Sequence, residues 1–197
     1  RDQPRSRGLG DVYKRQQYVN PMIGTDFTGN TYPGAQVPFG MVQLSPDNGL
    51  PGWDRISGYF YPDTTIAGFS HTHLSGTGAG DLYDISFMPV TRPYKEAPAP
   101  LGIYSTFSHN DEAASAGYYR VLLKDYNINV ELTATERCGI QRYTFPEAEA
   151  SVFLNLKKAM NWDFTLDSKI EVVDSTTIRG YRLSQGWTPL QLSLIHI

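Results

Sequence analysis

The sequence has little of what anchors or cross-links many membrane and secreted proteins. Cys138 is the only cysteine among 197 residues, so no disulfide can form within the chain. No apolar run approaches the roughly 20 residues that a membrane-spanning helix needs. Helical periodicity is also missing from the first third, which proline and glycine interrupt throughout. We therefore expect a globular fold with a conventional core and no long helix in this part.

The sequences at the two ends of the chain differ in character from the sequence between them. Codons can be chosen so that the DNA for DVYKRQ (11–16) is the reverse complement of the DNA for LSLIHI (192–197). That DNA resembles the mosaic end of transposase-based sequencing libraries, and the preceding SRGLG (6–10) also translates as adapter. We therefore expect residues 1–16 and 192–197 to be adapter-derived, not native, and to make few core contacts. The native segment, residues 17–191, is expected to be incomplete.

Setting those ends aside makes the charge balance more acidic. The full chain has 17 basic and 20 acidic residues, a net charge of −3. The ends hold five of the basic and two of the acidic residues, which leaves 12 against 18 and a net charge of −6. Nucleic acid is therefore not an expected partner. The remaining length suffices for one domain.

From about residue 117 the apolar residues recur with period two, which is typical of half-buried strands. One such strand alternates Val130, Leu132 and Ala134 with polar residues, and a second alternates Val152, Leu154 and Leu156 with Phe153, Asn155 and Lys157. Further strands are expected at 85–90, 140–145, 169–174 and 177–184, and a short helix or turn within 109–119. Short strands separated by turns predict an all-β fold, an antiparallel β-sandwich.

The stretch GFSHTHLSGTGAGDLYD (68–84) gathers residue types that occur in functional sites. His71 and His73 would project from one face of an extended segment, close enough to bind one metal ion. Hydrogen-bonded packing is the other interpretation of such a pair. A further metal ligand would have to come from Asp81, Asp84 or His109.

Three glycines in the same stretch, Gly76, Gly78 and Gly80, follow a G-x-G-x-G spacing. This spacing is neither the dinucleotide fingerprint nor a P-loop, because no Lys-Ser/Thr follows and no helix is expected to begin there. Phosphate binding is therefore disfavoured. Alternating glycines do let the backbone approach a ligand, a neighbouring domain or the rest of the same domain closely.

Trp53 lies in PGWDRISGYFY (51–61), beside Asp54 and Arg55. An indole face stacks on the apolar C–H side of a sugar ring, while carboxylate and guanidinium groups bind hydroxyls. The three residues therefore suit a carbohydrate pocket, which predicts a partly exposed indole. A core tryptophan beside a surface ion pair is the alternative.

Several of these segments together resemble the N-terminal domain of glycoside hydrolase family 92, the calcium-dependent exo-acting α-mannosidases. The matching segments are YVNPMIGT (18–25), TYPGAQVPFGMVQLSPD (31–47), GW and SGY within 52–59, IAGFSHTHLSGTGAGDLYDI (66–85) and ELTATERCGIQRYTF (131–145). They cover most of residues 17–191 in order, and on this basis the chain is identified as a member of the family.

The resemblance implies a β-sandwich N-terminal domain followed by a larger helical (α/α)6 catalytic domain, which is missing here and would be the main packing partner. Hydrolysis would invert the anomeric centre through an acid and a base on the missing domain. No catalytic residue is therefore assigned to this chain, and the fragment alone is expected to be inactive. The Ca²⁺ ion would be held mainly by the missing domain, so no metal ligand is assigned here either.

The resemblance further implies that this domain forms one wall of the active site for a mannose-containing glycan, cleaved with α-1,2-type preference. The expected substrate-binding residues are Trp53, Asp54 and Arg55, and the residues expected in the cleft or domain interface are His71, His73, Gly76, Gly78, Gly80 and Asp81. A periplasmic, secreted or cell-surface location is implied as well.

The chain departs from the family pattern at two places near the expected pocket. Many members carry Trp-Cys after GWD, where this chain has Arg55 and Ile56, and TDFTGN (25–30) replaces a histidine-bearing loop. Both departures bear on linkage preference. The carboxylate pairs Glu147 with Glu149 and Asp163 with Asp167 are interpreted as solvated charges.

Two other classes of function remain open. A stand-alone carbohydrate-binding module would share the sandwich and the exposed aromatic, and the part of the intact gene beyond residue 191 would distinguish it from an enzyme. A metal-binding sandwich protein would need His71 and His73 to converge with a third ligand.

Overall fold

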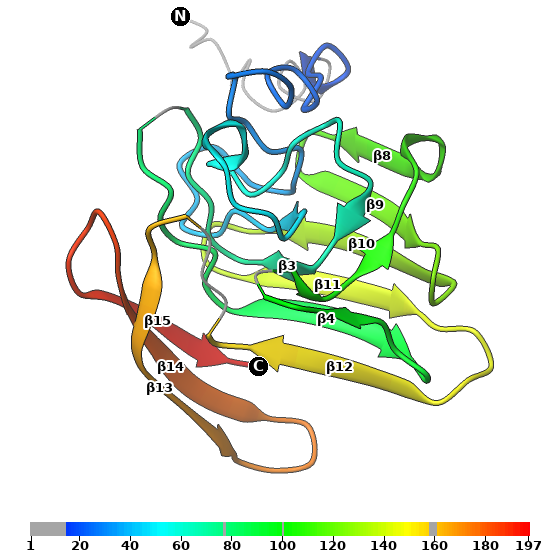
Figure 1. Ribbon diagram of the computed structural model, residues 1–197, viewed down its shortest axis with the longest axis vertical. Helices are drawn as coiled ribbons and strands as arrows, with labels where there is room; N and C mark the ends of the chain where they lie inside the picture. The colour runs from blue at the N-terminus through cyan, green and yellow to red at the C-terminus, as the bar shows by residue number, and fades with distance from the viewer. Residues whose placement is uncertain (1–14, 77, 100, 158–160) are drawn as a thin grey trace, which may run out of the picture.

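The computed structural model describes residues 15–76, 78–99, 101–157 and 161–197, so most of the predicted N-terminal adapter lies outside the described residues. Two antiparallel four-stranded sheets pack against each other (Figure 1). In the first sheet the strand order is β1 (Ser45–Asp47), β3 (Gly68–Ser70), β4 (Ser86–Thr91) and β12 (Ala150–Asn155). In the second sheet the order is β11 (Gly139–Thr144), β10 (Ile128–Ala134), β9 (Tyr118–Leu123) and β8 (Glu112–Ser115). The predicted all-β antiparallel fold is confirmed.

A third antiparallel sheet lies beside this sandwich, at the lower left of Figure 1. Its strands are β13 (Phe164–Val172), β14 (Ile178–Gln185) and β15 (Gln191–His196). Short ladders join β2 (Thr65–Ile66) to β7 (Ser105–Thr106) and β5 (Glu96–Ala97) to β6 (Gly102–Ile103). Two 3-10 helices, η1 (Trp53–Arg55) and η2 (His109–Asp111), interrupt the loops. In the part of the chain that the structure describes, no helix is both long enough and apolar enough to cross a membrane.

The core lies between the two four-stranded sheets, and the period-two pattern of β10 shows why. Ile128, Val130, Leu132 and Ala134 are buried, whereas the residues between them are less so. Successive side chains of a strand point to opposite faces, so this alternation turns one apolar face inward. A two-residue turn joins β8 to β9. Gly117 in this turn has a left-handed backbone conformation, with φ +77°, which glycine adopts without strain. The opposing sheet contributes Phe69, Met88 and Val90 to the same core.

The strands expected at 85–90, 140–145, 169–174 and 177–184 correspond to β4, β11, β13 and β14, and η2 lies where a short helix or turn is expected. The prediction that Val152 lies on the inward face of β12 and Phe153 on the outward face is wrong. Val152 is 45% exposed, while Phe153 packs against the core and meets Tyr94 edge to face, with ring centroids 5.1 Å apart. Both residues are apolar, so alternation alone does not fix the register, and turning the larger aromatic ring inward removes more apolar surface from water.

The expectation that residues 192–197 make few core contacts is also wrong. The segment forms most of β15 and pairs with β14. Ile195 is buried, and Ser193 Oγ donates a hydrogen bond of 2.6 Å to Asp84. The alternation of the segment and its β-branched residues suit an added edge strand. This placement does not bear on the origin of the residues, and their derivation from an adapter stays a prediction.

A buried arginine joins the third sheet to the sandwich. The Arg182 guanidinium, on β14, pairs with the carboxylates of Asp84 and Asp163. Its Nε also donates to the Leu156 carbonyl and to Thr165 Oγ1, each at 3.1 Å. All three charged groups are almost completely buried, so each charge is compensated inside the protein.

The interpretation of Asp163 as a solvated charge is therefore wrong. Asp163 pairs with Arg182, which lies 19 residues later in the sequence, on β14. Burial raises the pKa of the Asp163 carboxyl, and the Arg182 hydrogen bond opposes that shift. Asp167, Glu147 and Glu149 are exposed, as expected.

Candidate functional site

The turn that carries Trp53 is held rigidly by parts of the chain that are distant in sequence. Trp53 is the first residue of η1 and follows Gly52 directly. The bonds that hold the turn are Gly52 N–H to Asn161 Oδ1 at 2.9 Å, Ile56 N–H to Asn30 Oδ1 at 3.2 Å, and the Tyr83 hydroxyl to the Ile56 carbonyl. A backbone fixed at both ends presents its side chain in one direction at little entropic cost on binding.

The Trp53 indole is 55% exposed, which confirms the expected exposure and contradicts the core interpretation. It contacts one other indole, that of Trp162, with ring centroids 6.0 Å apart and planes at 71°. Trp162 is 46% exposed. Two partly exposed aromatic rings therefore meet at an edge-to-face contact, a favoured geometry for aromatic pairs.

The two charged neighbours of Trp53 have different surroundings. Arg55 donates from Nε and Nη2 to the Asp63 carboxylate, at 2.7 and 2.5 Å, and its guanidinium stacks over Phe60. The Asp63 hydrogen bond is the main cause that raises the pKa of Arg55. Asp54 forms no hydrogen bond or ion pair with any side chain that the structure describes. Arg55 is thus largely engaged within the protein, and the Asp54 carboxylate is available to a ligand.

The two histidines are both engaged in hydrogen bonds within the domain. His73 is buried, with Nδ1 2.7 Å from the Gln43 carbonyl and Nε2 2.9 Å from the Asp47 carboxylate. His71 lies 2.9 Å through Nδ1 from the Ile85 carbonyl, and burial lowers the pKa of its imidazole. The two rings therefore have separate partners, as the packing interpretation expects.

The other candidate metal ligands are engaged elsewhere. His109 pairs with Glu112 at 2.6 Å, Asp84 pairs with Arg182, and Asp81 accepts backbone hydrogen bonds. Within the described ranges, no group of three His, Cys, Asp or Glu residues could hold a metal ion. The side chains described here therefore do not fit a calcium site, which needs six to eight oxygen ligands.

The glycine-rich loop has an exposed tip and a buried base. Gly76 and Gly78 take positive φ values of +90° and +125°, and a Cβ added to either would meet nothing within 4 Å. At the base, a Cβ on Gly80 would lie 2.6 Å from the Asn161 side chain, so only glycine permits this approach. Asp81 is buried there and accepts from the backbone N–H groups of Trp187 and Thr188, at 2.9 and 2.7 Å.

The base of this loop therefore links the three tryptophans of the chain. Gly80 contacts Asn161, which precedes Trp162 and is bonded to the Trp53 turn, while Asp81 holds the backbone of Trp187. The Trp187 indole is 75% exposed. These segments lie close together at the left of Figure 1. The tip of the loop is open to a ligand or to another domain, and its predicted place in the cleft or interface stays a prediction.

The backbone directly after the loop is strained. Leu82, Tyr83 and Ile85 have φ values of +82°, +63° and +58°. Positive φ costs a non-glycine residue on the order of 1–3 kcal/mol and tends to occur where the surrounding contacts fix a functional geometry. The buried Tyr83 hydroxyl and Asp84 carboxylate supply such contacts at this segment.

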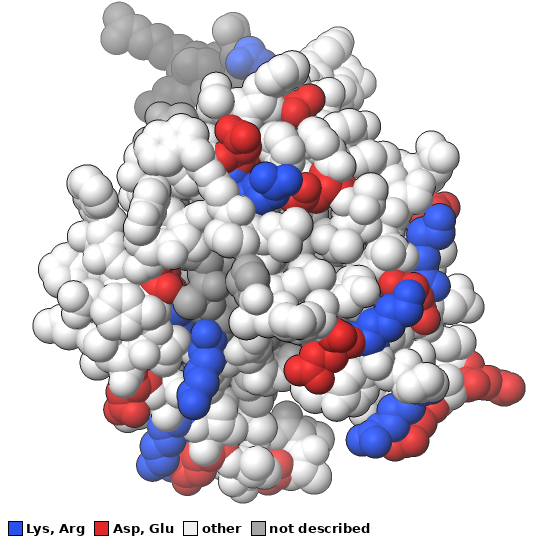
Figure 2. Space-filling view, viewed as in Figure 1, with Lys and Arg blue, Asp and Glu red and all other residues white. Residues whose placement is uncertain are grey.

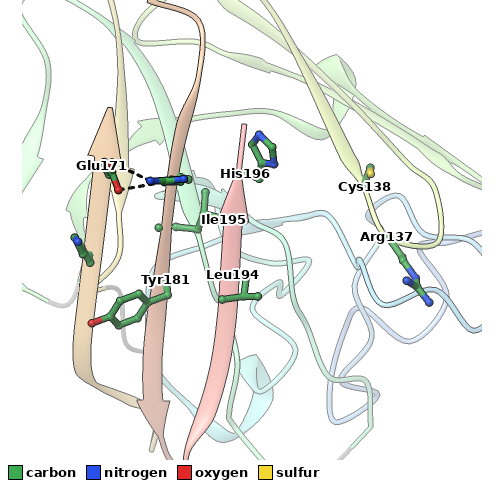
Figure 3. Close-up of a pocket in the computed structure, with 10 residues that line it drawn as sticks. Arg137, Cys138, Glu171, Tyr181, Leu194, Ile195 and His196 are labelled. Carbon is green, nitrogen blue, oxygen red and sulfur yellow. Dashed lines mark hydrogen bonds and ion pairs between the residues drawn. The ribbon is translucent and has the colours of Figure 1, made fainter. Parts of the chain in front are cut away.

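A separate hollow of about 690 Å³ lies between the third sheet and the turn at Cys138 (Figure 3). Aliphatic side chains of β15 and the Glu171–Arg179 ion pair line it. No predicted site residue lies among its walls. Charged side chains elsewhere on the visible face alternate in sign, with no continuous basic stripe (Figure 2).

Comparison with models of protein families first places the chain among the domains of glycosyl hydrolases. Residues 18–194 match the model of the glycosyl hydrolase family 92 N-terminal domain. Because this match spans most of the sequence, the chain belongs to glycosyl hydrolase family 92.

Solved structures support the assignment. A family GH92 α-mannosidase from Bacteroides thetaiotaomicron, solved alone and in complex with mannoimidazole, is 41% identical with a TM-score of 0.87; the match covers 93% of this chain and 25% of that one. An inverting GH92 mannosidase from the same species is 30% identical with a TM-score of 0.68, and the match covers 87% of this chain and 23% of that one.

A curated relative from Arthroderma benhamiae, an uncharacterized secreted glycosidase, is 28% identical over 151 residues, which is 72% of this chain and 18% of the relative. The chain therefore spans about a quarter or less of the relatives it matches. The activity of a whole enzyme is a proposal for this chain.

Sequence reasoning missed Asn161 and Trp162. A local signal for Trp162 exists, because Trp-Asp occurs at 53–54 and again at 162–163. The contact itself joins residues 109 positions apart and has no local signature, as the Gly52 to Asn161 bond illustrates.

Proposed function

We propose that this chain forms one wall of the active site of an exo-acting, inverting, calcium-dependent α-mannosidase that trims mannose from glycans, with α-1,2-type preference. The observation that carries the proposal is the half-exposed Trp53 indole, fixed on a rigid turn beside an Asp54 carboxylate that has no hydrogen-bond or ion-pair partner among the side chains the structure describes. Family membership and the mannosidase relatives support it.

In this proposal Trp53 stacks on the apolar face of the terminal mannose, and Asp54 accepts hydrogen bonds from its hydroxyl groups. Two of the five N–H groups of Arg55, on Nε and Nη2, are held by Asp63, so only the remaining ones could reach the substrate, and the pair otherwise stiffens the turn. A sugar bound in this way is oriented before any bond breaks, which is the usual contribution of a binding wall to the rate.

The acid, the base and most of the calcium ligands belong to the helical domain of the whole enzyme. Calcium would polarise and orient the terminal mannose. The tip of the glycine loop and the surface around it face that domain. A secreted, periplasmic or cell-surface location follows from the class of substrate, and the secreted relative supports it.

Asp54→Ala in the whole family 92 enzyme that contains this domain, called the parent enzyme below, tests the proposal. We expect kcat/KM on an α-1,2-mannobiose to fall roughly tenfold or more, because a charge-assisted hydrogen bond is lost. The matched control is Asp167→Ala, which removes an exposed carboxylate on β13. Equal kcat/KM for the parent enzyme and Asp54→Ala, with both folded, would remove Asp54 from the substrate site.

The alternative of a stand-alone carbohydrate-binding module uses the same Trp53 face. It predicts that the isolated chain binds mannosides as tightly as the parent enzyme does. The enzyme proposal predicts much weaker binding by the isolated chain, because one wall alone buries little of the sugar. Calorimetric titration of both proteins with mannobiose separates the two.

A further inference from the structure

Trp162 lies beside the Trp53 turn, and nothing in the proposed function uses it. Its indole is 46% exposed and is inclined at 71° to that of Trp53. In an edge-to-face pair only one face of one ring is covered by the partner. Each indole therefore keeps a face for another contact, and the two planes form a corner.

Asn161 fixes both halves of this corner. Its Oδ1 accepts the Gly52 N–H at 2.9 Å, directly before Trp53, and its backbone continues into Trp162. Asn161 has a left-handed φ of +56°, which asparagine tolerates better than most residues, and Gly80 packs against its side chain. One side chain thereby sets the position of the Trp53 turn relative to the Trp162 indole.

The chemistry of the corner suits a sugar better than an apolar protein surface. Asp54 stands next to Trp53 and has no hydrogen-bond or ion-pair partner among the described residues, and Arg55, whose charge interacts with it, is paired with Asp63. Covering this carboxylate with an apolar protein face would leave a charge uncompensated, at a large cost. A glycan supplies both hydroxyl donors for the carboxylate and apolar C–H faces for the two indoles.

If the terminal mannose stacks on Trp53, its position also fixes where the next sugar of the glycan lies. The next sugar of the glycan is joined to that mannose by the bond to be cleaved, so it must occupy neighbouring space. Linked sugar rings are generally not coplanar, and the Trp162 plane is inclined to that of Trp53.

We propose that Trp162 is a second sugar-stacking residue, which binds the sugar that leaves when the terminal mannose is cleaved, and that Asn161 positions both indoles. This inference rests on the proposed function, because it takes Trp53 as the contact of the terminal mannose. It assigns to this domain a share in recognising the glycan beyond the cleaved residue.

The test compares two substrates of the parent enzyme that share the terminal mannose. α-Mannosyl fluoride has no leaving sugar, whereas α-1,2-mannobiose does. Trp162→Ala should lower kcat/KM on mannobiose by roughly three- to tenfold, the value of one stacking contact, and lower it much less on mannosyl fluoride, which retains the Trp53 contact. Trp162→Phe keeps an aromatic face and should retain most activity on both.

Asn161→Ala should lower kcat/KM on both substrates, because it releases the Trp53 turn as well as Trp162. Asn161→Asp keeps the Oδ1 acceptor for Gly52 N–H and should restore most of the loss. Rescue by Asn161→Asp would show that Asn161 acts by positioning the two indoles. Thermal unfolding of each variant shows separately whether the variant is folded.

The outcomes distinguish the role of Trp162 from the proposed function. Equal losses on both substrates for Trp162→Ala, or no loss on mannobiose, would overturn the role of Trp162 while leaving the proposed function in place. No loss for Trp53→Ala on either substrate would overturn the proposed function itself.

Discussion

Arg182 and Asp84 form a buried ion pair across 98 residues of sequence. Asp84 lies in the strained segment after the glycine loop, and Arg182 lies in the middle of the third sheet. The neighbouring Tyr83 donates to the Trp53 turn. The third sheet therefore stabilises the segment that holds the candidate sugar-binding turn.

Arg182→Ala should destabilise the domain by about 3–5 kcal/mol, because it leaves two buried carboxylates without their common partner. Urea unfolding followed by circular dichroism measures this. The matched control is Arg179→Ala on the same strand, whose side chain is 62% exposed in its pair with Glu171. We expect little change there, since exposed pairs contribute little. Equal effects of the two substitutions would refute a special role for Arg182.

The sequence predicts the strands well because period-two alternation is a local property. Residues 128–134 illustrate this, since each inward position is apolar. The same reasoning fails at Val152 and Phe153, where both faces are apolar and only the packed partner decides which turns inward. It also fails for Asp163, because a carboxylate beside Trp162 gives no local sign of the arginine on a later strand.

Some features of the candidate site could be predicted from the sequence, and others depend on the folded structure. The partial exposure of Trp53, expected from its place in a carbohydrate pocket, is confirmed. The internal hydrogen bonds of His73 and Arg55 depend on Asp47 and Asp63, whose positions only the folded chain sets. Asn161 and Trp162 could not be placed beside Trp53 without the structure, because they reach it through tertiary packing alone.

Deleting residues 192–197 should lower the stability of the chain. The deletion removes most of β15, exposes the edge of β14 and loses the burial of Ile195, which contributes on the order of 2 kcal/mol. Thermal unfolding of the truncated and complete chains measures the difference. An unchanged midpoint would restore the expectation that this segment makes few core contacts.

His71 should make the stability of the domain depend on pH. Burial lowers the pKa of the folded imidazole below its ordinary 6.5, so the unfolded state binds the proton more readily. The contribution of His71 is therefore complete at higher pH and declines as the pH falls below about 6.5. His71→Asn keeps a donor for the Ile85 carbonyl and cannot titrate in this range.

Urea unfolding at about pH 7.5 and about pH 5.5 tests this, and the quantity compared is the change in unfolding free energy between the two conditions. We expect a smaller change for His71→Asn than for the unaltered chain. The same change in both proteins would show that His71 binds protons equally in the folded and unfolded states.

Trp53→Ala in the parent enzyme should lower kcat/KM on mannobiose by the value of a stacking contact, on the order of 1–2 kcal/mol or more. The indole is half exposed, so the unfolding midpoint should stay nearly constant. Trp53→Phe, which keeps an aromatic face, should recover part of the activity. A Trp53→Ala enzyme that unfolds at a much lower temperature would instead indicate a structural role.

We propose that this chain supplies a binding wall and that the catalytic groups lie elsewhere in the enzyme. The most direct measurement is mannose release from α-1,2-mannobiose, with Ca²⁺ present, by this chain alone and by the parent enzyme at equal concentrations. We expect release by the parent enzyme and none by the chain alone, because inverting hydrolysis needs an acid and a base on opposite sides of one sugar. Calcium-dependent mannose release by the chain alone would show that this chain itself carries catalytic groups.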